Sequence, residues 1–166
     1  MKRLTLMRHA KSSWENESLD DFDRPLNSRG ERTAPLMGQR LLALGDLPEL
    51  IVTSPAARAI GTARLVAGVI GYPEERILEA HGLYHASPET IIEILRSLET
   101  AARHVMLVGH NPGFTELANT LGDIRIDNIP TAGMLCVEMP GEVWSDIEPD
   151  QAEAVYFDYP KKPRSG

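Results

Sequence analysis

Short apolar runs alternate with longer amphipathic segments along most of the chain. A short apolar run bounded by polar residues is typical of a strand buried in a sheet. Five such runs predict strands, at residues 4–7, 49–53, 105–108, 134–139 and 154–159. A sixth run, 76–79, is a weaker strand candidate because it is so short.

The segments between these runs place apolar residues three and four positions apart, which is the spacing of one helix face. They predict four helices, at residues 28–44, 55–70, 88–98 and 114–121. Serines stand at the N-cap position of the first three helices, at Ser28, Ser54 and Ser87. Gly45 and Gly71 follow the first two helices as terminators.

The alternation of strands with helices favours a single α/β domain with a mostly parallel sheet. We assign residues 1–159 to this domain and interpret residues 160–166 as a frayed C-terminal tail. The length of 166 residues suffices for one hydrophobic core. We expect the protein to be a monomer.

Charge and composition narrow the range of functions. The formal net charge of −7 opposes non-specific binding to nucleic acid and to anionic membranes. Cys136 is the only cysteine and lies in an apolar run, which indicates a buried thiol rather than a disulfide or a nucleophile. The sequence shows no leader segment and no apolar run of bilayer length, so we expect a cytoplasmic protein.

Basic side chains follow three of the predicted strands. Arg8 and His9 end the first strand, Arg58 lies in the first turn of the helix after the second strand, and His110 follows the most apolar strand. Because parallel strands end at one edge of a sheet, we expect these four side chains to converge. Two guanidinium and two imidazole groups suit a tetrahedral dianion. They do not suit a divalent metal, because arginine cannot ligate one and no carboxylate cluster accompanies them.

Each of these features has a plainer interpretation when it is taken alone. Arg8 and His9 are also compatible with a strand-end salt bridge and a surface histidine. Arg58 opposes the helix dipole in its first turn, so it needs either a bound anion or an acidic partner elsewhere in the chain. The sequence leaves both possibilities for Arg58 open.

Two polar loops hold further charged groups. Loop 11–27 directly follows the candidate site and could border it, and its acidic run 20–23 is interpreted as a solvated face paired with Arg24. His81 and His85 have the spacing of metal ligands on a helix, but no cysteine or paired carboxylate accompanies them. We interpret both as surface or pocket-rim histidines.

Three motifs, in this order, resemble those of the histidine phosphatase superfamily: MRHA at 7–10, SPAARA at 54–59 and VGHNP at 108–112. The stretches RHAKSSW at 8–14 and DFDRPLNSRG at 21–30 look most like the SixA-type phosphohistidine phosphatase branch. The resemblance implies a phosphoglycerate mutase-like fold, which is a three-layer α/β/α sandwich in one domain.

The resemblance also implies roles for the convergent side chains. His9 would be the nucleophile that becomes phosphorylated, and Arg8, Arg58 and His110 would bind the phosphoryl group. No metal or organic cofactor is implied. One ring nitrogen of His9 must be unprotonated to attack, so we expect the other to donate to a backbone carbonyl. Ala10 stands where glycine is common in the family. Its methyl group should leave slightly less room for a ligand to approach the backbone.

The general acid is the part of the pattern that the sequence matches least. Glu79 is a weak candidate, and its alternative is a solvated carboxylate at a strand end. An imidazole leaving group needs less help from an acid than an alkoxide does. The leading hypothesis is therefore a phosphohistidine phosphatase that acts on a phosphohistidine-containing signalling protein. The alternatives are a small-molecule phosphomonoesterase and a non-catalytic module that binds phosphate or a phosphoprotein.

Overall fold

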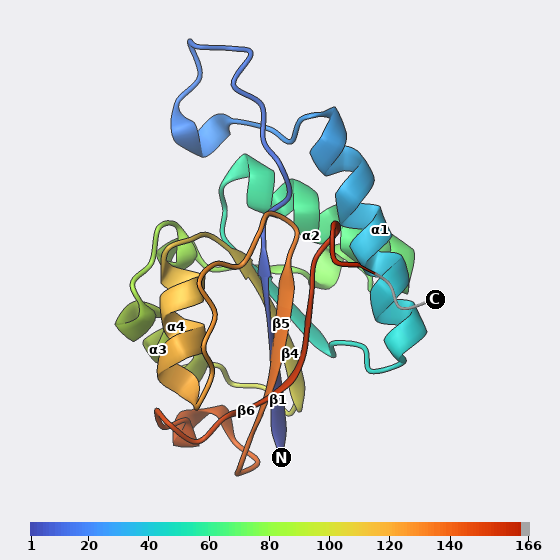
Figure 1. Ribbon diagram of the computed structural model, residues 1–166. Helices are drawn as coiled ribbons and strands as arrows, with labels where there is room; N and C mark the ends of the chain where they lie inside the picture. Colours follow the sequence, from blue (N-terminus) through green and yellow to red (C-terminus); the bar gives the residue numbers. More distant parts are fainter. Residues whose placement is uncertain (164–166) are drawn as a thin grey trace.

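A six-stranded sheet forms the centre of the computed structural model, which describes residues 1–163 (Figure 1). The strands lie in the order β3-β2-β4-β1-β5-β6. The first four in this order are parallel, whereas β5 is antiparallel to β1 and to β6. The bounds are β1 Lys2–Arg8, β2 Leu50–Thr53, β3 Leu78–Glu79, β4 His104–Gly109, β5 Met134–Met139 and β6 Glu153–Asp158. The predicted α/β class with a mostly parallel sheet is confirmed.

Helices cover both faces of this sheet, as Figure 1 shows. On one face lie α1 Ser28–Leu44 and α2 Ala57–Ile70, and on the other lie α3 Pro88–Arg96 and α4 Gly113–Leu121. This arrangement gives the expected three-layer α/β/α sandwich.

Strand β1 lies between β4 and β5 and is covered on both faces, which explains its continuous apolar run. Leu4 and Leu6 point into the core beneath α3 and α4, whereas Met7 points into the core beneath α1 and α2. Cys136 on β5 is buried, as the sequence predicted. The burial of β1 fixes where its end, and therefore the candidate site, lies.

Two of the predicted helix starts are wrong. Asn27, not Ser28, caps α1, because Asn27 is extended and its side chain accepts a hydrogen bond from the Gly30 amide at 2.8 Å. Helix α2 begins at Ala57 rather than at residue 55. The Ser54 hydroxyl lies 2.8 Å from Nε2 of His110, so this side chain contacts a residue of the candidate site instead of capping the helix.

The other helix ends follow the sequence signals. Ser87 caps α3 by accepting a hydrogen bond from the Thr90 amide, and Pro88 occupies the first turn. Gly45 and Gly71 end α1 and α2 in the left-handed region, each with φ of 79°. Glycine adopts this conformation without the steric cost that a side chain would bring.

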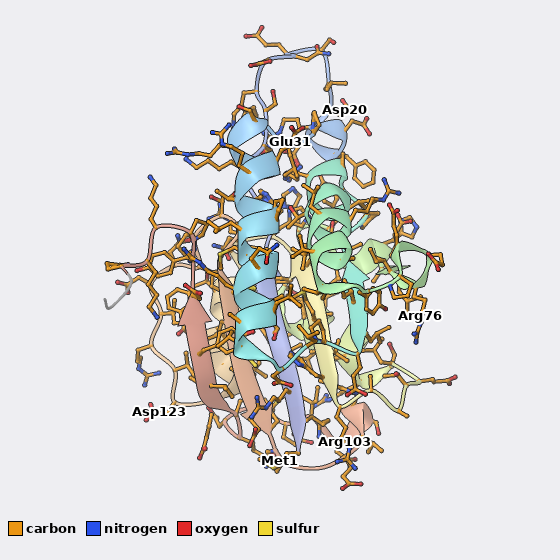
Figure 2. All side chains as sticks on the ribbon, turned by 90° about the vertical axis from the view of Figure 1, so that its right-hand side faces the viewer. Met1, Asp20, Glu31, Arg76, Arg103 and Asp123 are labelled. Atoms are coloured by element: carbon orange, nitrogen blue, oxygen red, sulfur yellow. The ribbon has the colours of Figure 1, made fainter. Side chains whose placement is uncertain are left out.

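The two ends of the sheet carry different parts of the chain. The parallel strands run toward the end from which the loop after β1 projects, where Figure 2 labels Asp20 and Glu31. Met1 and Arg103, which precede β1 and β4, lie at the opposite end in the same view. The carboxyl ends of the parallel strands therefore face loop 11–27.

The chain after β6 returns to α1. Nη1 of Arg40 donates to the carbonyl of Tyr159 at 2.6 Å, and Nη2 donates to the carbonyl of Pro160 at 3.1 Å. These bonds hold the beginning of the predicted tail against the domain. Residues 164–166 of that tail lie outside the described residues. Among the described residues, no helix is long and apolar enough to cross a bilayer.

Candidate active site

Three parallel strands bring basic side chains to one cavity. Arg8 ends β1 and His9 follows it, Arg58 lies in the first turn of α2 after β2, and His110 follows β4. All four side chains line a cavity of about 540 Å³ at the carboxyl ends of these strands. Loop 11–27 forms part of its wall through Lys11, Ser12, Trp14, Asp21, Arg24 and Asn27.

His9 is held with one ring nitrogen available for chemistry. The residue is only 7% exposed, and its Nδ1 lies 2.7 Å from the carbonyl oxygen of Ala10. Because a carbonyl only accepts hydrogen bonds, Nδ1 carries the ring proton. Nε2 therefore keeps its lone pair, and Nε of Arg58 donates to it at 3.3 Å. The expected hydrogen bond from His9 to a backbone carbonyl is present.

Both buried histidines of the cavity are neutral. Burial, helped by the charges of Arg58 and Arg8, outweighs the Ala10 hydrogen bond and lowers the pKa of His9 to about 4. Burial also lowers the pKa of His110 to about 3, with further contributions from His9 and Arg58. The two ring centroids lie 5.3 Å apart. At neutral pH, His9 is ready to attack without first losing a proton.

Arg8 is a partly buried cation with little to neutralise it. Its Nη1 donates to the carbonyl of Ile129 at 3.1 Å. Within residues 1–163, its buried Nε has no hydrogen-bond partner. Burial lowers the pKa of Arg8, which is the expected effect of desolvating a charge. A guanidinium in this state gains more from a bound anion than a solvated one does.

Arg58 is 2% exposed and is held by Asp21 of loop 11–27. Its Nη1 donates to the Asp21 carbonyl at 2.7 Å, and its Nη2 donates to Oδ2 of Asp21 at 2.9 Å. The sequence left an acidic partner and a bound anion as alternatives for Arg58. The structure supplies the acidic partner and also places Arg58 in the cavity.

Comparison with known proteins places this arrangement in a family. Residues 4–87, which include Arg8, His9 and Arg58, match the model of the histidine phosphatase superfamily, branch 1. The chain belongs to the histidine phosphatase superfamily. An uncharacterized protein of Mycobacterium tuberculosis is 34% identical over 93% of this chain and 100% of its own length. An uncharacterized chloroplast protein of Arabidopsis thaliana is 33% identical over 87% of this chain and 70% of its own.

Solved structures agree with the family and narrow it to the SixA type. A crystal structure from Agrobacterium tumefaciens, assigned as the phosphohistidine phosphatase SixA, superposes with a TM-score of 0.79 at 27% identity. That match covers 96% of this chain and 98% of the other. The protein histidine phosphatase SixA complexed with tungstate superposes with a TM-score of 0.80 at 18% identity, over 95% and 96% of the two chains, and shows the same fold.

Asp21 is the centre of a network that the sequence did not predict. Besides Arg58, its Oδ2 accepts hydrogen bonds from the hydroxyl of Tyr84 at 2.6 Å and from Nε2 of His85 at 3.1 Å. The predicted local pairing of the acidic run with Arg24 is also present, at 3.1 Å from Oδ1. Interpreting this run as a solvated face was wrong for Asp21. In the sequence, the DFDR stretch was the only indication of an ion pair for Asp21, and it indicated Arg24 rather than Arg58.

Glu79 is not part of the cavity, so its prediction as general acid is corrected. It ends β3, which pairs with β2 over only two positions, and its side chain is exposed. It lines a separate cavity with Arg64, Glu74 and Glu75. Strand β3 is at the edge of the sheet, and β2 and β4 separate it from β1, so Glu79 is too far across the sheet to reach His9.

The side chains around His9 are unsuited to holding a metal. Within residues 1–163, no group of three or more His, Cys, Asp or Glu side chains has the arrangement of a metal site. The Asp21 carboxylate, which is the acidic group in the wall, is occupied by arginine, tyrosine and histidine donors. The arrangement instead offers a neutral nucleophile beside two cations that can bind the oxygens of a phosphoryl group.

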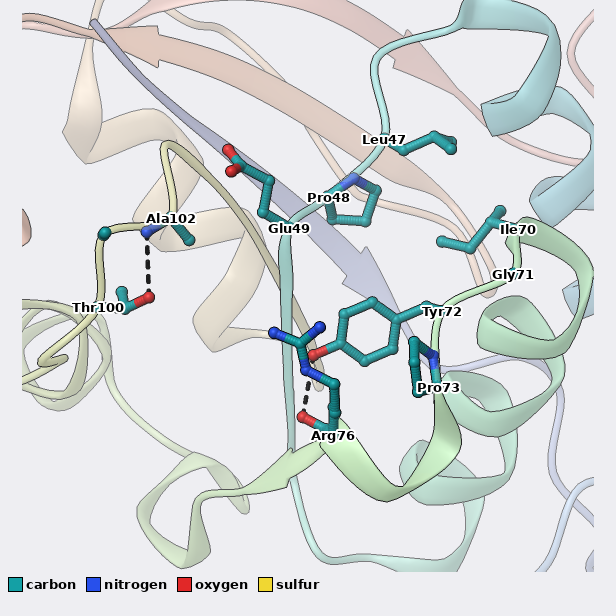
Figure 3. Close-up of a pocket in the computed structure, with 11 residues that line it drawn as sticks. Leu47, Pro48, Glu49, Ile70, Gly71, Tyr72, Pro73, Arg76, Thr100 and Ala102 are labelled. Carbon is teal, nitrogen blue, oxygen red and sulfur yellow. Dashed lines mark hydrogen bonds between the residues drawn. The ribbon is translucent and has the colours of Figure 1, made fainter.

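A cavity of similar size lies at the opposite end of β2 and β4, and Figure 3 shows its lining. It has a volume of about 560 Å³. The hydroxyl of Tyr72 donates to the Arg76 carbonyl at 2.9 Å, and Oγ1 of Thr100 accepts from the Ala102 amide at 3.1 Å (Figure 3). Oε1 of Glu49 accepts from two backbone amides that lead into β4. These side chains therefore form hydrogen bonds that stabilise the neighbouring backbone.

Proposed function

We propose that this protein is a phosphatase that transfers a phosphoryl group from phosphohistidine to His9 and then to water. The observation that carries the proposal is the state of His9. It is buried and neutral, its proton is held on Nδ1 by Ala10, and Nε2 faces the guanidinium of Arg58. A pocket that only binds phosphate has no use for a nucleophile prepared in this way.

The chemistry follows from the same contacts. The lone pair of Nε2 attacks phosphorus while the guanidinium groups of Arg8 and Arg58 bind the equatorial oxygens, where negative charge is held in the transition state. The bond to the leaving group breaks, and His9 becomes phosphorylated. Water then attacks the same phosphorus, and phosphate leaves. A dianion in the cavity also favours the protonated form of His110, which then becomes a further donor.

The groups around His9 favour a phosphoramidate over an alkyl phosphate. An alkoxide leaves only when a strong proton donor assists it, and carboxylic acids with a raised pKa usually supply that help. Burial alone would raise the pKa of Asp21, but the hydrogen bonds from Tyr84, Arg58 and His85 lower it well below its ordinary value. Asp21 is therefore ionised and holds no proton to give. A leaving imidazole needs less assistance.

A neighbouring groove supports a substrate larger than the phosphoryl group itself. A cavity of about 600 Å³ shares Arg8, Lys11 and Thr131 with the one around His9 and is also lined by Arg29 and Lys161. This concentration of cations is notable on a chain of net charge −7. It suits an anionic partner such as a phosphorylated signalling protein.

A substrate panel tests the proposal. The protein is incubated with a phosphohistidine peptide, a sugar phosphate and an aryl phosphate, and released phosphate is measured together with acid-labile phosphate bound to the chain. We expect the highest kcat/KM on the phosphohistidine peptide and labelling that His9→Ala abolishes. His81→Ala is the matched control, because His81 lies outside the cavity. Faster turnover of the sugar phosphate would favour a small-molecule phosphomonoesterase. Binding of phosphate without any turnover would favour a binding module.

A further inference from the structure

His85 occupies an ordered position at the mouth of the cavity. Its Nε2 lies 3.1 Å from Oδ2 of Asp21, and its ring centroid lies 4.2 Å from that of Tyr84 and 5.1 Å from that of His110. The side chain is 52% exposed, whereas His110 beneath it is 3% exposed. His85 therefore stands one layer further out than the groups that surround the phosphoryl site.

The contacts of His85 leave one of its nitrogens for proton exchange. Because the Asp21 carboxylate is ionised, it accepts the Nε2 proton of His85 and fixes the plane of the ring. Nδ1 is then the atom that can give up or take a proton. A carboxylate that orients a histidine in this way is a common arrangement where imidazole acts as an acid or base.

The leaving group of a phosphohistidine places a special demand on the site. Its ring is bonded to phosphorus through one nitrogen, and the nitrogen that must gain a proton lies on the far side of the ring. The proton donor for such a substrate must stand about one ring width further from phosphorus than a donor to an ester oxygen. His85 lines the same cavity as His9 and is more exposed than His110, whose ring centroid lies 5.1 Å away. The leaving ring of a protein substrate has to lie on this solvent-facing side.

We propose that Nδ1–H of His85 protonates the departing imidazole of a phosphohistidine substrate. The inference rests on the function proposed above and deepens it, because it makes His85 a determinant of substrate class. A second histidine is a suitable donor, since acid and leaving group are then the same chemical group. Glu79, the acid expected from the sequence, lies in another cavity.

The two steps balance as follows. Nε2 of His9 forms a bond to phosphorus, the substrate P–N bond breaks, and its electron pair goes to the leaving ring. The far nitrogen of that ring takes the proton from Nδ1 of His85, so a neutral imidazole departs and His85 becomes neutral. Water then attacks phosphorus and the electron pair of the second P–N bond returns to His9. The proton that water loses goes to Nδ1 of His85, and hydrogen phosphate leaves.

The backbone at His85 determines which variant is informative. Its φ of 51° lies in the left-handed region, where asparagine and histidine are tolerated better than most residues. His85→Asn therefore keeps the local fold and removes the ring. His81→Asn, in the same loop but outside the cavity, is the matched control. Circular dichroism and thermal melting check that both variants fold.

The experiment compares two leaving groups. Turnover is measured on a phosphohistidine peptide and on p-nitrophenyl phosphate, whose leaving group needs no acid. In His85→Asn we expect the rate on phosphohistidine to fall roughly 10²-fold. This loss should exceed the loss on p-nitrophenyl phosphate by at least about tenfold, and added free imidazole should restore part of it. His81→Asn should keep both rates.

Three outcomes would overturn the proposal. An equal loss on both substrates without rescue would mean that His85 only steadies Asp21 and Arg58. An unchanged rate on phosphohistidine would mean that no proton passes through His85. If the wild-type protein itself labels His9 from p-nitrophenyl phosphate but does not turn over phosphohistidine, the substrate proposed above is wrong, and the role of His85 is withdrawn with it. The wild-type arm separates this last failure from the first two.

Discussion

The cavities at the two ends of the parallel strands are nearly equal in volume, about 540 Å³ around His9 and about 560 Å³ around Tyr72. They differ in how their polar groups are satisfied. Around Tyr72, side-chain oxygens bind neighbouring backbone groups, as Figure 3 shows. Around His9, two histidines are held neutral by burial, and Arg8 keeps a buried N–H without a partner among the described residues.

This difference shows that a cluster of buried basic groups, rather than hollow space, distinguishes the candidate active site. The segments at the carboxyl ends of β1, β2 and β4 each bring at least one basic side chain to the same cavity. Such groups cost stability when the cavity is empty and are stabilised when an anion enters. Among residues 1–163, no comparable cluster of buried basic groups surrounds Tyr72, and substitutions there should affect the local fold alone.

The largest expected effect comes from changing the geometry of one cation at the functional end. Arg8→Lys keeps the charge but loses the planar fork that binds two oxygens at once. We expect kcat/KM to fall roughly 10²-fold to 10³-fold. Tyr72→Phe, which removes a hydroxyl at the other end, should leave kcat/KM unchanged. Comparable losses in both variants would contradict the division between the two ends.

A smaller effect should appear in the pH dependence of stability. The folded pKa of His9 is about 4, whereas an unfolded histidine titrates near 6.5. As pH falls below about 6.5, the unfolded chain takes up a proton that the folded chain does not bind, so stability is lost toward a pH of about 4. We expect His9 alone to account for about 2 kcal/mol of unfolding free energy between about pH 7 and about pH 5.

Urea unfolding of the wild-type protein and of His9→Asn at the two pH values measures this term. His110 and the buried His104 also have lowered pKa values, because burial disfavours their charged forms, so the wild-type protein should lose more than the His9 share. His9→Asn should reduce the pH dependence by that share. An identical pH dependence in the two proteins would mean that His9 is not held neutral by the fold.

The smallest effect concerns Asp21, which both holds Arg58 and places a negative charge beside the phosphoryl site. Asp21→Asn should loosen Arg58 and lower kcat about tenfold, because a positioning contact is lost. It should also tighten the binding of phosphate or tungstate, because repulsion between the carboxylate and the dianion is removed. Calorimetric titration and steady-state kinetics measure the two changes. A fall in anion affinity would contradict this role.

The sequence predicted those features that depend on a single strand or helix. Arg8, His9 and His110 follow apolar runs, and the rule that parallel strands share an edge was enough to bring them together. Prediction from the sequence failed where a side chain is positioned by a partner that is distant in the chain. Asp21 meets Arg58 across a separation of 37 residues. The Ser54 hydroxyl contacts His110, which is 56 residues away in the chain, instead of capping a helix.

The prediction of Glu79 as general acid was wrong for a different reason. The order of the strands in the sheet is not visible in the sequence, and β2 and β4 separate the edge strand β3 from β1. The wrong start of α1 was a matter of one residue, because Asn27 and Ser28 are both good caps and only the extended backbone of Asn27 decides between them. Physical rules identified the basic side chains that share the cavity, whereas long-range contacts determined which of several similar local structures formed.

The three hydrogen bonds that tie Arg40 of α1 to Asp158, Tyr159 and Pro160 have a consequence for how specificity can change. They make the stretch after β6 a wall of the cationic groove next to the phosphoryl cavity, through Tyr159, Pro160 and Lys161. Under the function proposed above, replacing this stretch should alter which phosphorylated molecules dock without changing His9, Arg58 or His110. These three groove residues can therefore vary independently of the nucleophile, whereas Arg8 and Lys11 are shared by both cavities.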